Sequence, residues 1–438
     1  MPNTVTAALT ILKKADIETM SAGRGLPNNQ NAPALPAWPL LTLLYGFPII
    51  WALGLLQIAP IILAFVMLGY MLVRGSVRIY PALWVWGALT FWVVVCAVSL
   101  VEPTDLIAWG FRFSGVFCAG VFTLYYFNAR AAITPDRLLG GLVTLWVTLV
   151  LLGWGGVLFP NFRLQTPMSF IMPASILQNP LARDYMLPPL AEVQRPWGAP
   201  EAYNRPSAPF PYANSWGLAY TLLTPIMLAY LLRLRNRWAQ AGLVVALLLS
   251  TVPAVKTSNR GMFIGLGIVV AYVLLRQLFA RNWRAVAFGV GVVAVGVIGL
   301  FATGTVAEIL GRQNYSDSTG GRAALYKSTW EATLQSPIVG YGTPRMEPSV
   351  GVSMGTQGYL WTLMFCFGFV GLGLFLVFLS SAVFSGLRVG TASGYWLHAV
   401  PVSCFVVLIF YSFDITQLSV LLLSSALCVR SNYYGEGL

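Results

Sequence analysis

Apolar runs of about 20 residues, the length of a helix that spans ~30 Å of hydrocarbon, recur along most of this chain. The strands of a membrane β-barrel would instead alternate apolar and polar residues. Charged residues make up 9 % of the 438 residues, against about 25 % in soluble domains. The sequence therefore predicts an all-α, polytopic membrane protein and excludes a cytosolic or secreted enzyme.

The length criterion predicts about twelve transmembrane helices. They start near Pro39, Ile58, Pro81, Leu106, Leu138, Trp216, Trp238, Met262, Ala285, Gln357, Ser393 and Ile415. The first two share an unbroken apolar run, which Gln57 and Pro60 are expected to divide by a tight turn. The predicted organisation is a tail (1–38), helices 1–5 (39–159), a long loop (160–215), helices 6–9 (216–304), a second long loop (305–356), helices 10–12 (357–430) and a C-terminus (431–438).

The loops between the predicted helices alternate in charge. One set of loops is short and basic and includes the N-terminal tail with Lys13 and Lys14. The other set contains both long loops and the acidic residues Glu102, Asp105 and Asp414. Short basic loops mark the cytoplasmic side, so both termini are expected in the cytoplasm. This bias also accounts for much of the net charge of +12, so no nucleic-acid partner is expected.

The two long loops differ in composition. The loop 160–215 is rich in proline and is expected to be mostly extended and stiff. The loop 305–356 contains a predicted amphipathic helix, capped by Ser318 or Thr319 and ended by Pro337. Its apolar face is expected to follow Tyr326, Trp330 and Leu334.

Arginines gather in the loops assigned to the outer face, where positive charge is uncommon. A guanidinium presents a planar fork of donors that matches phosphate oxygens, so such a group suits a lipid-linked diphosphate. The alternative is a set of ordinary surface ion pairs with acidic residues of the same loops. The basic residues are Arg163, Arg183, Arg195, Arg205, Arg260, Arg312, Arg322, Arg345, Lys256 and Lys327, and the acidic ones are Asp184, Glu192, Glu201, Glu308, Asp317, Glu331 and Glu347.

Three arginines stand out individually. Arg260 lies in a short polar break between two apolar runs, where helix-end N–H groups could complete an anion site; snorkelling to lipid headgroups is the alternative. Arg322 opens the predicted loop helix, an unfavourable place for a cation unless an anion is bound. Arg112 lies within a predicted membrane helix, and either a functional role, snorkelling or a pair with Asp105 would explain it.

The remaining chemistry is sparse. The single histidine, His398, is expected to be packed near the cytoplasmic end, so no triad and no zinc site are expected on the outer face. The five cysteines lie in apolar runs and show no metal-ligand spacing. No nucleotide fingerprint is present either. A donor used outside the cytoplasm must therefore arrive activated, and a polyprenyl diphosphate sugar meets that demand.

Three stretches resemble the O-antigen ligase and polymerase superfamily of bacterial envelope glycosyltransferases. They are Ser258-Asn259-Arg260-Gly261, the stretch Ser318 to Gly342 that ends in Pro-x-x-Gly-x-Gly, and Arg205 to Asn214. The resemblance implies a GT-C-like fold in the inner membrane of the cell and a metal-independent, inverting glycan transfer that needs no cofactor. By motif position, it implies that Arg205, Arg260 and Arg322 hold the donor diphosphate and stabilise its developing charge. Further substrate-binding candidates are Arg195, Arg312, Arg345, Lys256, Lys327, Gln357 and Tyr359.

The chain departs from the family pattern at one position. Family ligases carry a histidine just before the tenth helix, where this chain has Gln357, which can orient a hydroxyl but cannot accept its proton. Glu192, Asp317 and Glu347 are the candidate bases. The departure favours a polymerase that joins lipid-linked repeats over a ligase that transfers the glycan to a lipid, protein or wall acceptor.

A flippase for the same lipid-linked glycan is the third possibility, which the nearly uncharged membrane runs disfavour. The expected partners are a polyprenyl diphosphate-linked glycan, membrane lipids and, as proteins, a chain-length regulator or a flippase.

Overall fold

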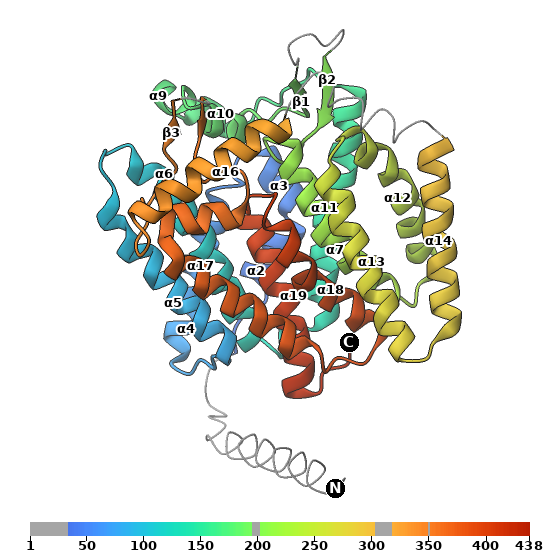
Figure 1. The fold of residues 1–438 in the computed structure, drawn as a ribbon. Coiled ribbons are helices and arrows are strands. Elements are labelled where there is room, and N and C mark those ends of the chain that lie inside the picture. The colour runs from blue at the N-terminus through green and yellow to red at the C-terminus, as the bar shows by residue number, and fades with distance from the viewer. Residues whose placement is uncertain (1–33, 195–201, 303–317, 349–350) are drawn as a thin grey trace, which may run out of the picture.

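The computed structural model describes residues 34–194, 202–302, 318–348 and 351–438. These residues are mostly helical (Figure 1). In chain order the elements are α2 (Trp38–Tyr45), α3 (Phe47–Ala52), α4 (Ala59–Arg74), α5 (Pro81–Val95), the 3₁₀ turn η2 (Cys96–Ser99), α6 (Asp105–Asn128), α7 (Pro135–Leu158), α8 (Pro167–Ile171), α9 (Ala174–Leu177), α10 (Pro180–Met186), β1 (Ala191–Gln194), β2 (Tyr203–Pro206), α11 (Ala213–Leu231), α12 (Arg237–Lys256), α13 (Arg260–Phe279), α14 (Trp283–Ala302), α16 (Ser318–Gln335), β3 (Met346–Glu347), β4 (Val352–Ser353), α17 (Tyr359–Gly386), α18 (Ala392–Val407) and α19 (Ile415–Tyr434).

The chain is a polytopic helical membrane protein. Within the described residues, six helices are long and apolar enough to cross a membrane: Pro81–Ser99, Asp105–Asn128, Pro135–Leu158, Arg237–Lys256, Arg260–Phe279 and Tyr359–Gly386. Three apolar helices are shorter: Ala59–Arg74, Trp283–Gly299 and Ala392–Val407. The first apolar run does break before Pro60, because the chain leaves helix α3 after Ala52 and re-enters helix at Ala59.

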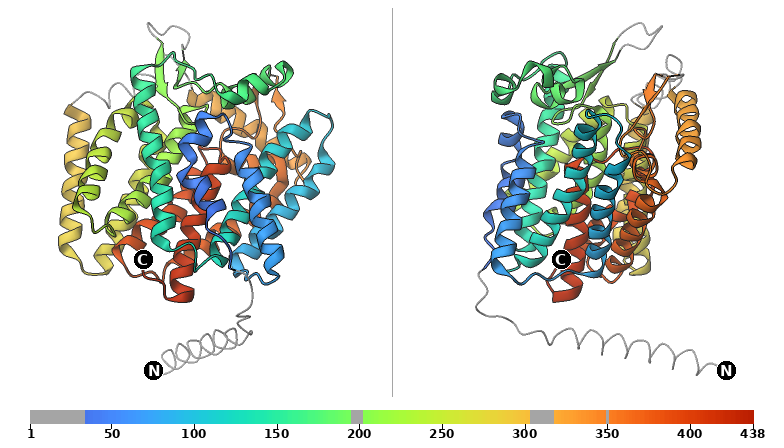
Figure 2. Two further views of the ribbon diagram at one scale, coloured as in Figure 1. Left: turned by 180° about the vertical axis from the view of Figure 1, so that it is seen from behind. Right: turned by 90° about the vertical axis from the view of Figure 1, so that its left-hand side faces the viewer.

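The centre of the helix layer is formed by α19, α11 and α18. Helix α19 packs against α6, α17 and α18, and α11 packs against α7 and α18. Some hydroxyls buried there bond to backbone within their own helix, as Ser419 does when it donates to the carbonyl of Ile415. Others join helices: Ser393 of α18 donates to the carbonyl of Ala229 in α11. Helix α14 lies at the edge of the layer and packs on α13 (Figures 1 and 2).

The segment between α7 and α11 is not the extended chain that its prolines predict. It forms the three short helices α8, α9 and α10 and the two-stranded sheet β1–β2. Proline fits the first turn of a helix, where its missing N–H has no helical partner, and Pro167 and Pro180 both occupy that place. The side chains of Thr166 and Asn179 cap these two helices.

Both long connecting segments lie on one side of the helix layer, here called the loop face. Figure 2 shows α8–α10 and the β1–β2 sheet together with α16 on this side, while the C-terminus lies on the other. Helix α16 confirms the predicted helix and ends two residues before Pro337. Its buried face is offset from the prediction, because Leu325, Thr329 and Thr333 are buried whereas Trp330 and Leu334 are about half exposed.

The Pro-x-x-Gly-x-Gly turn after α16 docks on a break in α17. Gly368 has a φ of +66° and interrupts the helical hydrogen bonds of α17. The turn replaces them: the amides of Tyr341 and Gly342 donate to the carbonyls of Phe365 and Cys366. Gly340 also has a positive φ, and a Cβ there would lie 2.5 Å from the Phe365 carbonyl oxygen. Gly340 therefore permits a close backbone-to-backbone contact with α17.

Candidate functional site

The polar break between α12 and α13 lies on the loop face. It combines exposed cationic side chains with buried polar ones. Thr257 and Asn259 are buried, whereas Lys256 and Arg260 on either side are exposed. Ser258 turns the chain between them with a φ of +50°. Arg260 is the first residue of α13, so its charge stands beside the positive end of that helix. Such a placement favours an anion next to it.

Arg205 supports this break from the β1–β2 sheet. The sheet register places Glu192 directly opposite Arg205. The Arg205 Nε donates to the Thr257 carbonyl oxygen at 2.7 Å, its Nη2 to Asn214 Oδ1 at 3.1 Å, and its Nη1 lies 3.5 Å from Glu192 Oε2. The residue is only 6 % exposed. Each guanidinium nitrogen therefore faces a protein oxygen.

Glu192, one of the candidate bases, is bonded at both carboxylate oxygens. Its Oε2 accepts from the amide of Ala213 at the start of α11, and its Oε1 accepts from the Gln194 side chain. Arg205 lies beside it, so the carboxylate belongs to the group of bonded side chains that supports the break. Its hydrogen bonds give it a supporting position below the break.

Asn259 is held from the opposite direction by Tyr411, in the connection between α18 and α19. The Tyr411 hydroxyl donates to Asn259 Oδ1, and the Asn259 amide nitrogen donates to the Ala213 carbonyl. Two glycines make room for this contact. A Cβ at Gly261 would lie 2.7 Å from the Tyr411 hydroxyl, and one at Gly217 would lie 2.2 Å from the Asn259 amide.

Tyr411 also joins this break to the start of α17. Its carbonyl accepts from the amide of Tyr359 at 2.7 Å, and the neighbouring Ser412 hydroxyl donates to the carbonyl of Thr356. Gln357 lies in this stretch, and its amide nitrogen donates to Ser353 and Thr356. Its Oε1 is buried and has no hydrogen-bond partner among the described residues.

Tyr359 itself is 4 % exposed, with its ring packed against Phe375 and Phe413. This packing corrects its assignment to the substrate surface, because the side chain faces the core. Tyr359 opens α17, and its ring belongs to the aromatic core.

The other predicted residues on the loop face lie apart from the α12–α13 break. Arg345 is half-buried, donates to the Ser99 carbonyl at 3.3 Å and lies 4.5 Å over the ring of Tyr341. Lys327 on α16 is exposed, with Glu331 at 3.9 Å. Glu347 is the end of strand β3. Arg163 and Arg183 pair with Asp184 at 2.7 and 3.7 Å, so these two form the ordinary surface bridges considered above.

Several predicted residues fall beyond what the structure describes. Arg195, Arg312 and Asp317 lie outside the described residues. Arg322 lies in the first turns of α16, where the backbone is described and the side chain is not.

A half-buried carboxyl near the break was missed by the sequence analysis. Asp414 caps α19 through a capping box with Gln417, and its Oδ2 accepts from the Tyr185 hydroxyl of α10 at 3.0 Å. Burial raises the pKa of the Asp414 carboxyl to about 6, while the Tyr185 hydroxyl, the Arg112 guanidinium and the Ser215 hydroxyl act to lower it. Asp105 bonds elsewhere, to the amides of residues 101 and 102.

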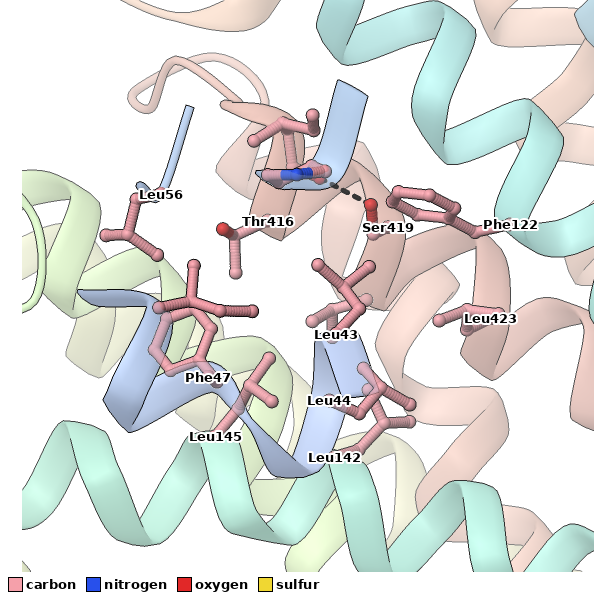
Figure 3. A pocket seen from close by; sticks show the side chains of 14 residues that line it. Leu43, Leu44, Phe47, Leu56, Phe122, Leu142, Leu145, Thr416, Ser419 and Leu423 are labelled. Carbon is pink, nitrogen blue, oxygen red and sulfur yellow. Dashed lines mark hydrogen bonds between the residues drawn. The ribbon is translucent and has the colours of Figure 1, made fainter. Parts of the chain in front are cut away.

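Two other features lie apart from this cluster. His398 is buried and hydrogen-bonds to the Tyr272 hydroxyl and the Val383 carbonyl, which confirms it as a packed histidine. An apolar pocket lies between α2–α3, α7 and α19, with Thr416 and Ser419 among its lining residues (Figure 3). It contains none of the predicted site residues, and its lining carries no ionisable group.

These observations define a helical membrane protein with an exposed cation fixed on a buried polar cluster. The model of the O-antigen ligase family matches residues 245–376. The match covers the α12–α13 break, α16, the glycine turn and the break in α17, and it confirms the resemblance of the chain to the O-antigen ligase and polymerase superfamily. No curated protein sequence matches the chain. Arg205 and Tyr411 lie outside the matched residues.

Proposed function

We propose that the chain is a polysaccharide polymerase of the O-antigen type. It moves a glycan from a polyprenyl diphosphate, such as undecaprenyl diphosphate, to the sugar of a second lipid-linked repeat. The proposal includes twelve membrane crossings in a GT-C-like arrangement, both termini in the cytoplasm, and a loop face on the outer side of the inner membrane. The observation that carries it is Arg260, an exposed cation at the start of a 20-residue helix whose support is buried.

The proposed reaction needs a fixed positive charge where the diphosphate leaves. The acceptor hydroxyl oxygen forms a bond to the anomeric carbon as the bond from that carbon to the diphosphate breaks. The electron pair of the broken bond stays on the diphosphate, beside Arg260 and Arg322, and the hydroxyl proton goes to a carboxylate, with Glu347 and Asp317 as candidates. Fixed cations aimed at developing charge supply much of the rate enhancement in such sites. Lys256, Lys327, Arg345, Arg195 and Arg312 would attract the anionic donor.

Gln357 is proposed to orient the acceptor. Its buried Oε1, which has no partner in the part of the chain that the structure describes, can accept a hydrogen bond from a sugar hydroxyl. A buried acceptor left without a partner costs about 1–3 kcal/mol, so a hydroxyl that satisfies it would bind there preferentially.

Transfer to a lipid, protein or wall acceptor is the second candidate function, because the matching family model describes O-antigen ligases. Purified protein in liposomes, supplied only with lipid-linked repeats, separates the two. A ladder of glycan lengths supports the polymerase, whereas an inert donor that reacts after addition of another acceptor supports the ligase.

The catalytic part of the proposal is tested with Arg260→Ala in the same liposomes. We expect the initial rate to fall by about 10²–10³, the typical loss when one charge-stabilising donor is removed. Arg388→Ala is the matched control, because Arg388 is exposed in the connection between α17 and α18. An unchanged rate for Arg260→Ala would remove this residue from the reaction.

A further inference from the structure

Arg260 follows a corner of the chain that is fixed on two sides, and both fixing residues are buried. On one side, Arg205 bonds to the carbonyl of Thr257, and on the other, Tyr411 bonds to the side chain of Asn259. We infer that Tyr411 and Arg205 are positioning residues: they hold the α12–α13 break so that Arg260 meets the donor diphosphate. This inference rests on the proposed function and assigns the two residues a part in it.

Tyr411 is suited to the role of a positioning residue by its burial, its hydroxyl and its backbone carbonyl. It is 3 % exposed, so it is sealed from solvent by the surrounding helices. Its hydroxyl lies over Gly261, the residue after Arg260, where any side chain would collide with it. Its backbone carbonyl meanwhile holds the amide of Tyr359 at the start of α17. One residue thus fixes Arg260 relative to the stretch that contains Gln357.

Arg205 acts from below, and its contacts differ from those of a phosphate-binding arginine. Its Nε, Nη1 and Nη2 face Thr257, Glu192 and Asn214, all within 3.5 Å. The adjacent Glu192 carboxylate would repel a phosphate that approached the same guanidinium. Arg205 is therefore placed under the break, and the role of holding the diphosphate passes to the exposed Arg260.

A displacement of the break changes the kinetics in a recognisable way. Misplacing a reacting or charge-stabilising group by about 1 Å can cost ~10²-fold in rate. An interaction made mainly in the transition state affects kcat, whereas KM for the lipid-linked donor changes little. Loss of a positioning contact should therefore appear in kcat, and only while Arg260 is present.

The test is a double-mutant cycle between Tyr411→Phe and Arg260→Ala. Tyr411→Phe keeps the ring beside Gly261 and removes the hydroxyl. We expect it to lower kcat by about 10-fold or more in the natural protein and by less than about 3-fold in Arg260→Ala, because partners that act as a unit are not additive. Tyr220→Phe is the control, since that buried hydroxyl bonds to Ser250, and we expect its rate to be unchanged.

Each other outcome overturns one statement. An equal loss in both backgrounds makes Tyr411 a general structural residue, and an unchanged kcat removes it from the mechanism. If Tyr411→Phe does not fold, Arg205→Lys replaces it in the cycle, because lysine keeps the charge and loses the fork that joins three oxygens. Full activity of Arg260→Ala would instead refute the proposed function, whatever Tyr411→Phe does.

Discussion

At the scale of single residues, each position of Ser258-Asn259-Arg260-Gly261 has a different physical task. Ser258 turns the chain at a positive φ, Asn259 is buried and bonded, Arg260 is exposed, and Gly261 leaves space for Tyr411. The sequence could identify the arginine because a charge between two apolar runs is conspicuous. It could not identify Tyr411, which lies about 150 residues away in sequence and looks like any aromatic residue in an apolar stretch.

Gly261→Ala tests the space beside Tyr411. The added methyl group would lie 2.7 Å from the Tyr411 hydroxyl, so the tyrosine must move. We expect a loss of about 1–3 kcal/mol in stability, as for other overpacked cores, together with reduced transfer activity. Gly267→Ala is the matched control in the same helix, because a Cβ there meets nothing within 4 Å. Thermal unfolding in detergent gives the stability of both variants, and equal melting temperatures for them would contradict the prediction.

Glu192→Gln tests the role of Arg205, because the two possible roles predict changes in different kinetic constants. If Arg205 supports the break, loss of the opposing charge loosens it, and kcat falls several-fold with KM for the lipid-linked donor nearly unchanged. If Arg205 bound the diphosphate, removal of the competing carboxylate would lower KM instead. Steady-state kinetics in liposomes distinguish these results. A lower KM would mean that Arg205 binds the donor diphosphate.

At the scale of elements, the helix over residues 318–335 could be predicted because its start and stop signals are local. Its buried face could not, since it depends on packing against α17, which is not visible in the local sequence. Tyr326 does contact α17, where it stacks on Trp361 at 4.2 Å between ring centroids, but the buried residues are Leu325, Thr329 and Thr333. The proline-rich segment was predicted incorrectly. Proline is compatible with both extended chain and a first helical turn, and only the neighbouring cap residues Thr166 and Asn179 distinguish the two.

Gly340→Ala tests the docking of the glycine turn on α17. Gly340 and Gly351 both have a positive φ, but only a Cβ at Gly340 would meet backbone, 2.5 Å from an oxygen. We expect Gly340→Ala to lower the melting temperature clearly more than Gly351→Ala, which carries the cost of the positive φ alone. Equal shifts would mean that the close contact with α17 contributes nothing measurable.

Asp414 at the start of α19 predicts a dependence on pH. Its pKa is raised to about 6 from an ordinary 3.8, so the stability gained from the protonated form is complete below pH 3.8 and is lost as the pH rises through 6. Asp414→Asn mimics the protonated form and still accepts the capping bond. We therefore expect the melting temperature of Asp414→Asn minus that of the natural protein to increase between pH 5 and pH 7. A difference independent of pH would contradict the raised pKa.

At the scale of the whole molecule, hydropathy predicts a helical membrane protein but not which distant segments meet. The cluster at the α12–α13 break combines residues from β1, β2, α11 and the α18–α19 connection. Loop charges predict on which side of the membrane this cluster lies.

Cysteine labelling tests this sidedness. Lys327 on α16 has 76 % of its side chain exposed on the loop face. We expect a membrane-impermeant maleimide to label Lys327→Cys in cells whose inner membrane is accessible but intact. Arg388→Cys should react only after permeabilisation. The five native cysteines are buried, which keeps the background low. If only Arg388→Cys were labelled in sealed cells, the orientation would be the opposite of the proposed one.

The break in α17 bears on how the protein is made. At Gly368 the helix exposes the carbonyls of Phe365 and Cys366 and the amide of Phe369, and the turn after α16 bonds to all three. Hydrocarbon offers no substitute partner for such groups. The turn is made before α17, because synthesis runs from the N-terminus, and in the proposed orientation it must first cross the membrane. The proposed orientation thereby couples insertion of α17 to export of the preceding segment, and we expect α17 to integrate poorly in a variant that lacks that segment.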